Sequence, residues 1–239
     1  MDIWRNRAVA CLLALLMPLA AAQPLLVLDS GHTPSKGGAL GTRGEYEVVY
    51  NDRFVSGLKT ALEKDGWQVL LTRQPEQEIT LAERAALANR QQADVFVSLH
   101  HDSAQLQYLE QTSHQGKQAY RTIRPIRGYS LFVSALNPQY SQSKQLATEI
   151  GRALRALGRQ PTLHHAEPIE GENRPLLDAA NGVYRYDGLA VLKQTEMPAV
   201  LLEIGVIVDE QDEAYVSDAA NRQKMIEAVV RALKAYWKH

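Results

Sequence analysis

Short apolar runs alternate with amphipathic segments along most of this chain. Continuous apolar runs predict buried strands, and apolar positions three and four residues apart predict helices. Strands are expected at residues 25–28, 68–72, 95–99, 128–134 and 199–204, with a further short one at residues 189–192. Helices are expected at residues 47–64, 80–92, 141–157 and 219–237. This alternation favours an α/β fold, with a single-domain, open, mostly parallel twisted sheet and helices on both faces.

Local signals mark the ends of several helices. Gly66 follows the first helix and favours its termination, and Thr80 with Glu83 forms a capping box that opens the second. The last helix is expected to turn four apolar side chains inward: Ile226, Val230, Leu233 and Trp237.

Three segments lack a clear period. Residues 30–44 (SGHTPSKGGALGTRG) are rich in glycine and polar residues, and they predict a long loop of the kind that is often functional. Residues 103–127 are polar and are expected to be a surface insertion, and residues 159–187 are irregular, with several prolines and glycines. No repeat or linker divides the sequence, so we expect one domain.

The first residues have the pattern of a secretion signal. A basic start with Arg5 and Arg7 precedes an apolar run at residues 8–17, and the small residue Ala22 suits cleavage before Gln23. The alternative is a transmembrane anchor, but a spanning helix needs about 20 apolar residues. We therefore expect a signal peptide at 1–22, a mature domain at 23–239, and no stable membrane anchor after cleavage.

Composition agrees with an exported globular domain. The chain has 239 residues, of which 45% are hydrophobic and 22% charged, and its net charge is −1. Such a composition excludes a disordered chain, and the near-neutral charge predicts no nucleic-acid partner. The sole cysteine, Cys11, lies in the expected signal peptide, so the mature protein is expected to depend on its core rather than on disulfides.

Three side chains of metal-ligand type fall where an open α/β sheet places its functional site. His32 follows the first strand, His100 follows the apolar run at residues 95–99, and Glu47 opens the first helix. Sites in such sheets lie beyond the carboxyl ends of the strands, and two imidazoles with one carboxylate form a ligand set of catalytic zinc. Each residue alone has an ordinary explanation in packing, surface exposure or helix N-terminal charge. The combination indicates a metal site.

Glu203 is a carboxylate inside the otherwise apolar run at residues 199–204. Burying such a group costs free energy unless it has a partner. A salt bridge is one explanation, and a general base beside water that is activated by the metal is the explanation we favour.

These motifs resemble the zinc-dependent N-acetylmuramoyl-L-alanine amidases of the amidase_3 type, from about residue 25 to the end. The family's Asp-x-Gly-His motif is matched by residues 29–32 (DSGH), and its ligand Glu with an Asn four residues on by Glu47 and Asn51. The third-ligand motif, Ser-Ile-His-Ala-Asp, is matched by residues 98–102 (SLHHD), and the catalytic Glu motif by residues 198–206 (PAVLLEIGV). The sequence departs where Thr-Pro replaces Gly-Gly after the first His and where Val replaces Phe after the last Gly.

This resemblance implies one zinc ion per chain, held by His32, Glu47 and His100, with Glu203 as the catalytic residue. Glu45 is an alternative second ligand, but the Asn spacing favours Glu47. The implied reaction is hydrolysis of the amide bond between N-acetylmuramic acid and L-alanine in peptidoglycan, in wall remodelling, daughter-cell separation or recycling. The implied partners are peptidoglycan and an activator protein, and the expected location is the periplasm, with secretion into the medium as second choice.

Two other functions remain open on the residues alone. One is a zinc peptidase or amidase that acts on another exported substrate, because the ligand chemistry does not specify the scissile bond. The other is a catalytically silent module that binds peptidoglycan.

Further candidates have weaker support. Arg43, His164 and His165 are candidate substrate-binding residues, and the alternatives are a loop salt bridge for the arginine and a solvated pair for the histidines. In some family members, a helix before the catalytic Glu blocks the zinc until a partner binds. Residues 165–187 are a candidate for such an element, although a plain surface loop is the simpler alternative. Its candidate blocking ligands are Glu167, Glu170 and Glu172.

Overall fold

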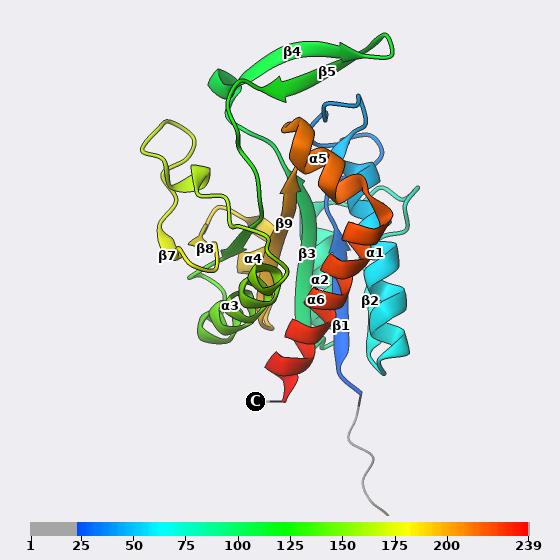
Figure 1. The fold of residues 1–239 in the computed structure, drawn as a ribbon. Helices are drawn as coiled ribbons and strands as arrows, with labels where there is room; N and C mark the ends of the chain where they lie inside the picture. Colours follow the sequence, from blue (N-terminus) through cyan, green and yellow to red (C-terminus); the bar gives the residue numbers. More distant parts are fainter. Residues whose placement is uncertain (1–22, 239) are drawn as a thin grey trace, which may run out of the picture.

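The computed structural model describes residues 23–238, and the expected signal peptide at residues 1–22 lies outside the described residues (Figure 1). The main sheet has seven strands in the order β2-β1-β3-β9-β6-β8-β7. In that order, the strands are β2 (Gln68–Leu71), β1 (Leu25–Ser30), β3 (Val95–Asp102), β9 (Ala199–Val206), β6 (Ser130–Val133), β8 (Val183–Arg185) and β7 (Leu176–Asp178).

The first four strands in this order run parallel to one another, and they form the part of the sheet that carries the candidate ligands. β6 is antiparallel to β9, β8 is parallel to β6, and β7 is antiparallel to β8. The apolar runs of the central strands are buried on both faces, as expected for parallel strands covered by helices. The predicted open, mostly parallel sheet is therefore confirmed.

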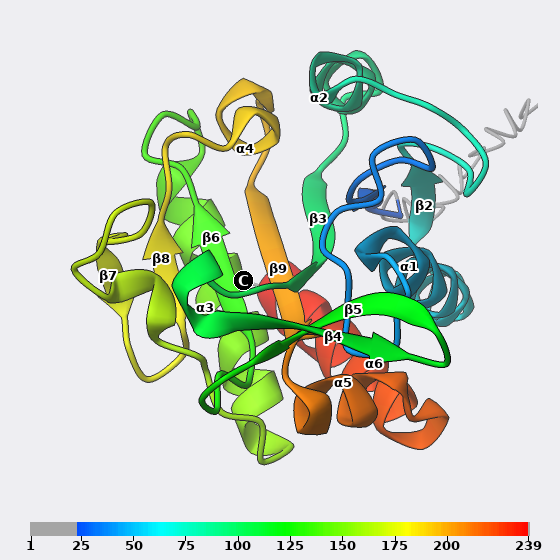
Figure 2. The same ribbon diagram turned by 90° about the horizontal axis from the view of Figure 1, so that it is seen from above.

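Helices cover both faces of the sheet, as predicted (Figure 2). One face is covered by α1 (Glu47–Lys64), α3 (Tyr140–Ala156) and α6 (Ala219–Trp237). The other is covered by α2 (Leu81–Arg90) and α4 (Ala190–Gln194). The capping box of Thr80 and Glu83 opens α2, and Gly66 follows α1 with a φ of 88° that suits glycine.

Residues 103–127 contain an ordered hairpin above the carboxyl ends of β3 and β9 (Figure 1). A short turn, η1 (Leu106–Tyr108), leads into β4 (Leu109–His114) and β5 (Lys117–Thr122), which pair antiparallel. The two turn residues, Gln115 and Gly116, both have positive φ, as a tight hairpin turn requires. The strands were missed because their exposed, polar sequence has no apolar alternation.

Three other expectations about the fold are corrected. Residues 189–192 were expected to form a strand but belong to the start of α4, because a four-residue apolar run does not distinguish a buried strand from a buried helical turn. Trp237, expected to point inward, is 43% exposed at the end of α6 and meets Trp67 edge to face. A helix that was not predicted, α5 (Glu210–Ser217), follows β9 and is capped by Asp209.

None of the helices formed by residues 23–238 combines the length and the apolar character needed to cross a membrane.

Candidate metal centre and active site

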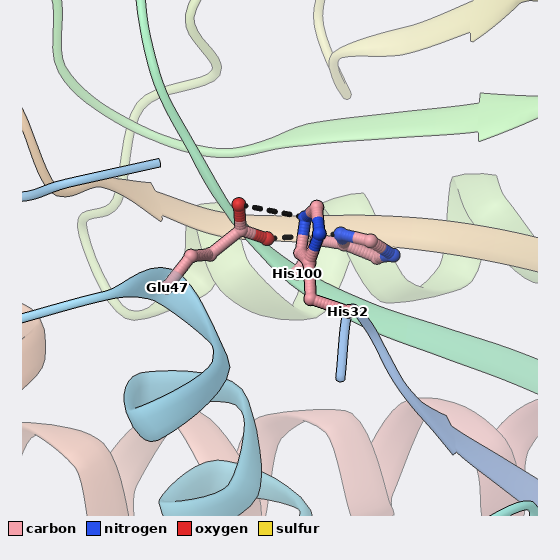
Figure 3. A group of neighbouring side chains, drawn as sticks. All are labelled: His32, Glu47 and His100. Carbon is pink, nitrogen blue, oxygen red and sulfur yellow. Dashed lines mark hydrogen bonds and ion pairs between the residues drawn. The ribbon is translucent and has the colours of Figure 1, made fainter. Parts of the chain in front are cut away.

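The structure brings His32, Glu47 and His100 together at the carboxyl end of the parallel strands (Figure 3). His32 follows β1, Glu47 is the first residue of α1, and His100 lies near the end of β3. One carboxylate oxygen of Glu47 lies 2.9 Å from His32 Nε2, and the other lies 2.9 Å from His100 Nδ1. The ligating atoms all lie within 4.8 Å of one another, so this group could hold one metal ion.

The glycine-rich loop after β1 packs directly against these three side chains. A Cβ added to Gly31 would overlap the ring of His100, and one added to Gly38 would lie 2.5 Å from a Glu47 oxygen and 2.7 Å from the His32 ring. Gly38 also has a φ of 79°, in the left-handed region that glycine adopts without strain. Because Gly31 and Gly38 have no Cβ, the backbone of this loop can lie in direct contact with the three candidate ligands.

Neighbouring groups orient the Glu47 carboxylate. Asn51, one helical turn later, donates from Nδ2 to Oε1 at 3.2 Å, and its own Oδ1 lies 2.8 Å from His101 Nδ1. The backbone N–H groups of His101 and Ala39 each donate to a Glu47 oxygen at 3.2 Å. Asn51 therefore holds the carboxylate of Glu47, the candidate second ligand, in its orientation.

Protonation of Glu47 is disfavoured even though the group is buried. Burial acts to raise the pKa of its carboxyl, but hydrogen bonds with His100 and His32 outweigh burial and hold the pKa well below its usual range. Glu47 is therefore anionic, as a candidate metal ligand should be. Glu45 instead forms two hydrogen bonds with Arg53, both at 3.0 Å, on the exposed side of the loop. The structure places Glu47, and not Glu45, beside both histidines.

Two buried arginines that the sequence analysis did not single out hold the loop that carries His32. Arg84 forms an ion pair of 2.5 Å with Asp29 and donates to the backbone oxygen of His32 at 2.5 Å. Arg73 donates to the same oxygen at 2.9 Å and pairs with Asp52 at 2.7 Å. Both arginines lie in ordinary helical or loop contexts, so the sequence carried no signal for this role.

Glu203 lies on β9 directly opposite His100 on β3, in register. Its Oε2 atom is buried and has no hydrogen-bond partner within residues 23–238. Burial first, and then the negative charges of Asp102 and Glu47, raise the pKa of this carboxyl well above its usual range. Glu203 and His100 line the same cavity, so the carboxyl of Glu203 faces the space beside the candidate metal site.

Of the candidate substrate-binding residues, His165 lines this cavity as well. Its Nε2 lies 2.8 Å from Asp102 Oδ2 and its Nδ1 lies 3.0 Å from Glu172 Oε2. Burial acts to lower the pKa of His165, but Asp102 and Glu172 outweigh it and raise the pKa to about 10. His164 is buried behind it, and Arg43 lies apart, 3.7 Å from the buried carboxylate of Glu213.

Two of the three candidate blocking glutamates, Glu167 and Glu172, bond to other residues in this conformation. Glu167 accepts hydrogen bonds from Tyr108 at 2.7 Å and from Arg124 at 2.5 Å. Glu172 bonds to His165, and Glu170 is exposed. Within the described part of the chain, none of the three belongs to the group formed by His32, Glu47 and His100.

The cavity wall contains two residues that the sequence analysis missed, Arg174 and Tyr186. The guanidinium of Arg174 lies 3.7 Å from the centre of the Tyr186 ring, and it reaches to 3.9 Å from Glu172. Both residues come from an irregular segment without a period, so only the folded structure reveals that they meet.

Comparisons with known proteins agree with this geometry. A family model described as N-acetylmuramoyl-L-alanine amidase, Amidase_3, matches residues 26–235. The probable cell wall amidase LytH of Staphylococcus saprophyticus is 28% identical over 222 residues, which are 90% of this chain and 60% of that protein. The uncharacterized protein YqiI of Bacillus subtilis is 27% identical over 240 residues, covering 98% of both chains.

A solved structure shares the fold. The CwlD amidase of Clostridioides difficile, solved in complex with the GerS lipoprotein, superposes with a TM-score of 0.68 at 20% identity, covering 90% of this chain and 99% of that one. This chain spans only 60% of the length of the Staphylococcus relative. The family match covers most of the chain, including every candidate ligand and Glu203. The chain belongs to the N-acetylmuramoyl-L-alanine amidase family, Amidase_3.

Proposed function

We propose that this chain is an exported, zinc-dependent N-acetylmuramoyl-L-alanine amidase, which hydrolyses the amide bond between N-acetylmuramic acid and L-alanine in peptidoglycan. The observation that carries the proposal is the position of Glu203, which lies in register with His100, lines the same cavity and has a buried Oε2 without a hydrogen-bond partner among residues 23–238. Family membership supplies the substrate class.

The proposed metal is one zinc ion at His32, Glu47 and His100. Two imidazole nitrogens and one anionic carboxylate are a donor set that zinc prefers, and one of the three residues, His100, lines the cavity that also contains Glu203. A zinc ion bound by such a set acts as a Lewis acid, which polarises a carbonyl and makes a water molecule more acidic.

The proposed proton carrier is Glu203. The carboxyl group of Glu203, which faces the cavity, accepts a proton from the attacking water and then delivers it to the nitrogen of L-alanine as the carbon–nitrogen bond breaks. A group that acts first as general base and then as general acid is most effective when its pKa lies near the working pH. Burial moves the pKa of Glu203 upward, in the direction that suits both acceptance of the proton from water and its delivery to the leaving nitrogen.

Two hollows meet at the ligands and provide room for a polymer on both sides of the scissile bond. The cavity beside Glu203 and a second groove, which runs between α2 and α4, are both lined by His100, Leu189 and Leu201. His32 faces the groove. We propose that the glycan and the stem peptide occupy these two hollows, and that Arg174 contacts the substrate from the cavity wall.

We also propose that the chain is exported and that it binds a partner protein. The basic and apolar pattern of residues 1–22 supports export, with the periplasm as first choice and the medium as second. The complex of the neighbour CwlD with the GerS lipoprotein supports a partner protein for this chain as well.

The test is digestion of purified peptidoglycan, analysed by mass spectrometry. We expect stem peptides with a free L-alanine amine to be released, release to stop with a chelator, and activity to return with zinc. A zinc-loaded protein that releases nothing would favour the silent binding module, and products cut within the stem peptide would favour a peptidase. A Glu196→Gln variant, which alters an exposed glutamate, serves as the control for protein quality.

A further inference from the structure

A second group of metal-ligand side chains lies at the cavity wall: Asp102, His164 and His165, of which His165 lines the cavity. Asp102 ends β3, and the two histidines form the short turn η2 (His164–Ala166) in the segment that follows α3. Nothing in the proposed reaction uses this group. We propose that Asp102, His164 and His165 form a second metal site, which takes a divalent transition ion such as zinc.

The first argument is convergence of three donor atoms. Asp102 Oδ2 lies 2.8 Å from His165 Nε2 and 3.6 Å from His164 Nε2. Donors on one tetrahedral zinc ion, with bonds of about 2.0 to 2.2 Å, lie roughly 3.3 Å apart. The observed separations bracket that value, so a small movement of side chains would place an ion among the three atoms.

The second argument is a buried nitrogen without a partner. His164 is 4% exposed, and its Nε2 has no hydrogen-bond partner anywhere in the described residues 23–238. Buried polar atoms are nearly always paired, because an unpaired one costs about 1–3 kcal/mol. This atom points toward Asp102, at the place where the ion would lie, and a metal bond would satisfy it.

The third argument is the support given to the other nitrogen of each imidazole. His164 Nδ1 lies 2.8 Å from the hydroxyl of Thr162, and His165 Nδ1 lies 3.0 Å from Glu172. Metal-binding histidines typically have their second nitrogen held in this way, by a carboxylate or another oxygen, which fixes the ring and its tautomer. Here both rings have such a partner.

Charge and donor type define the ligand. Asp102 and Glu172, whose side chains are 10% and 6% exposed, flank His165 and stabilise positive charge there, so a metal ion would take the place of the proton that the raised pKa of His165 otherwise holds. Two nitrogen donors exclude calcium and magnesium, which prefer oxygen alone, and favour zinc or a similar ion. An ion here would fasten η2 to the end of β3. It would thereby fix the wall from which His165 and Glu172 line the cavity.

The experiment counts metal ions per chain. Purified protein is stripped with a chelator, saturated with zinc, freed of excess ion and analysed by native mass spectrometry and elemental analysis. We expect two zinc ions per chain, one in His164→Gln, and one in His32→Ala. His114→Ala, which changes an exposed histidine on the hairpin, is the matched control and keeps two.

A second measurement protects the test against a variant that folds poorly. In His32→Ala, where the first group is broken, added zinc should still raise the melting temperature, and this rise should disappear in His32→Ala/His164→Gln. A single zinc ion in the wild-type protein, or two ions in His164→Gln, would overturn the proposal. These counts do not depend on whether the protein is an amidase, so failure here and failure of the proposed function are distinguishable.

Discussion

Replacing Glu203 with glutamine tests whether this residue is the proton carrier of the proposed reaction. The substitution keeps the size of the side chain but removes its ability to carry a proton. General acid–base catalysis by a positioned side chain contributes about 10²- to 10⁴-fold to the rate. We therefore expect kcat on peptidoglycan fragments to fall by about that factor, while the metal content remains unchanged because Glu203 is not in the ligand group.

The same variant should change how stability depends on pH. Folding raises the pKa of Glu203 well above that of the unfolded chain, so the native state binds the extra proton between the two pKa values. The free energy of unfolding then falls as pH rises through that window, by at most about 1.36 kcal/mol per pH unit for one group. Below the unfolded pKa this penalty is absent, and above the folded pKa it is complete.

Chemical denaturation of the metal-free protein across this pH range measures the difference. The wild-type protein should lose stability relative to Glu203→Gln as pH rises above about 4.5, the usual pKa of this carboxyl. Glu196→Gln should show no such difference. Activity within tenfold of wild type, or parallel stability curves for wild type and variant, would refute the assignment of a buried, proton-carrying carboxyl to position 203.

Three further predictions concern the groups around the ligands. Gly31→Ala places a methyl group where the His100 ring lies, so zinc affinity should fall sharply in a competition titration while the far-ultraviolet circular dichroism is unchanged. Unchanged zinc affinity would contradict the close contact between Gly31 and the His100 ring. Asn51→Ala removes the hydrogen bond that orients Glu47, and zinc affinity should fall about 10- to 100-fold by the same titration; equal affinity would show that Asn51 does not position the ligand. Arg84→Met leaves Asp29 buried without its partner, and urea denaturation should show a loss of about 3–5 kcal/mol; a loss below 1 kcal/mol would show that the pair is dispensable.

The central sheet and its helices could be predicted because their sequences agree with their environment. The apolar run at residues 95–99 predicts a buried parallel strand, and the structure has β3 there. Thr80 and Glu83 have the spacing of a capping box, and in the structure they form this motif at the start of α2. Periodicity gives no signal where an element is mostly exposed or very short. For this reason the polar hairpin β4–β5 was missed and the short helix α4 was predicted to be a strand.

The sites were predictable to the extent that their residues fall at strand ends. His32, His100 and Glu203 each lie near the carboxyl end of a strand, and the topology alone brings such positions to one edge of the sheet. Residues from irregular segments have no such rule. The meeting of His165 with Asp102, and of Arg174 with Tyr186, depends on a path through residues 159–187 that no local pattern specifies.

The most direct test of the proposed reaction is hydrolysis of peptidoglycan in water enriched in oxygen-18, with the products weighed by mass spectrometry. Hydrolysis of the bond between the lactyl group of N-acetylmuramic acid and L-alanine places the new oxygen on the lactyl carboxylate and leaves the free stem peptide unlabelled. We predict that result for the zinc-loaded wild-type protein, and label incorporation about 10²- to 10⁴-fold slower for Glu203→Gln. Label in the stem peptide, or release of unlabelled glycan, would contradict the account.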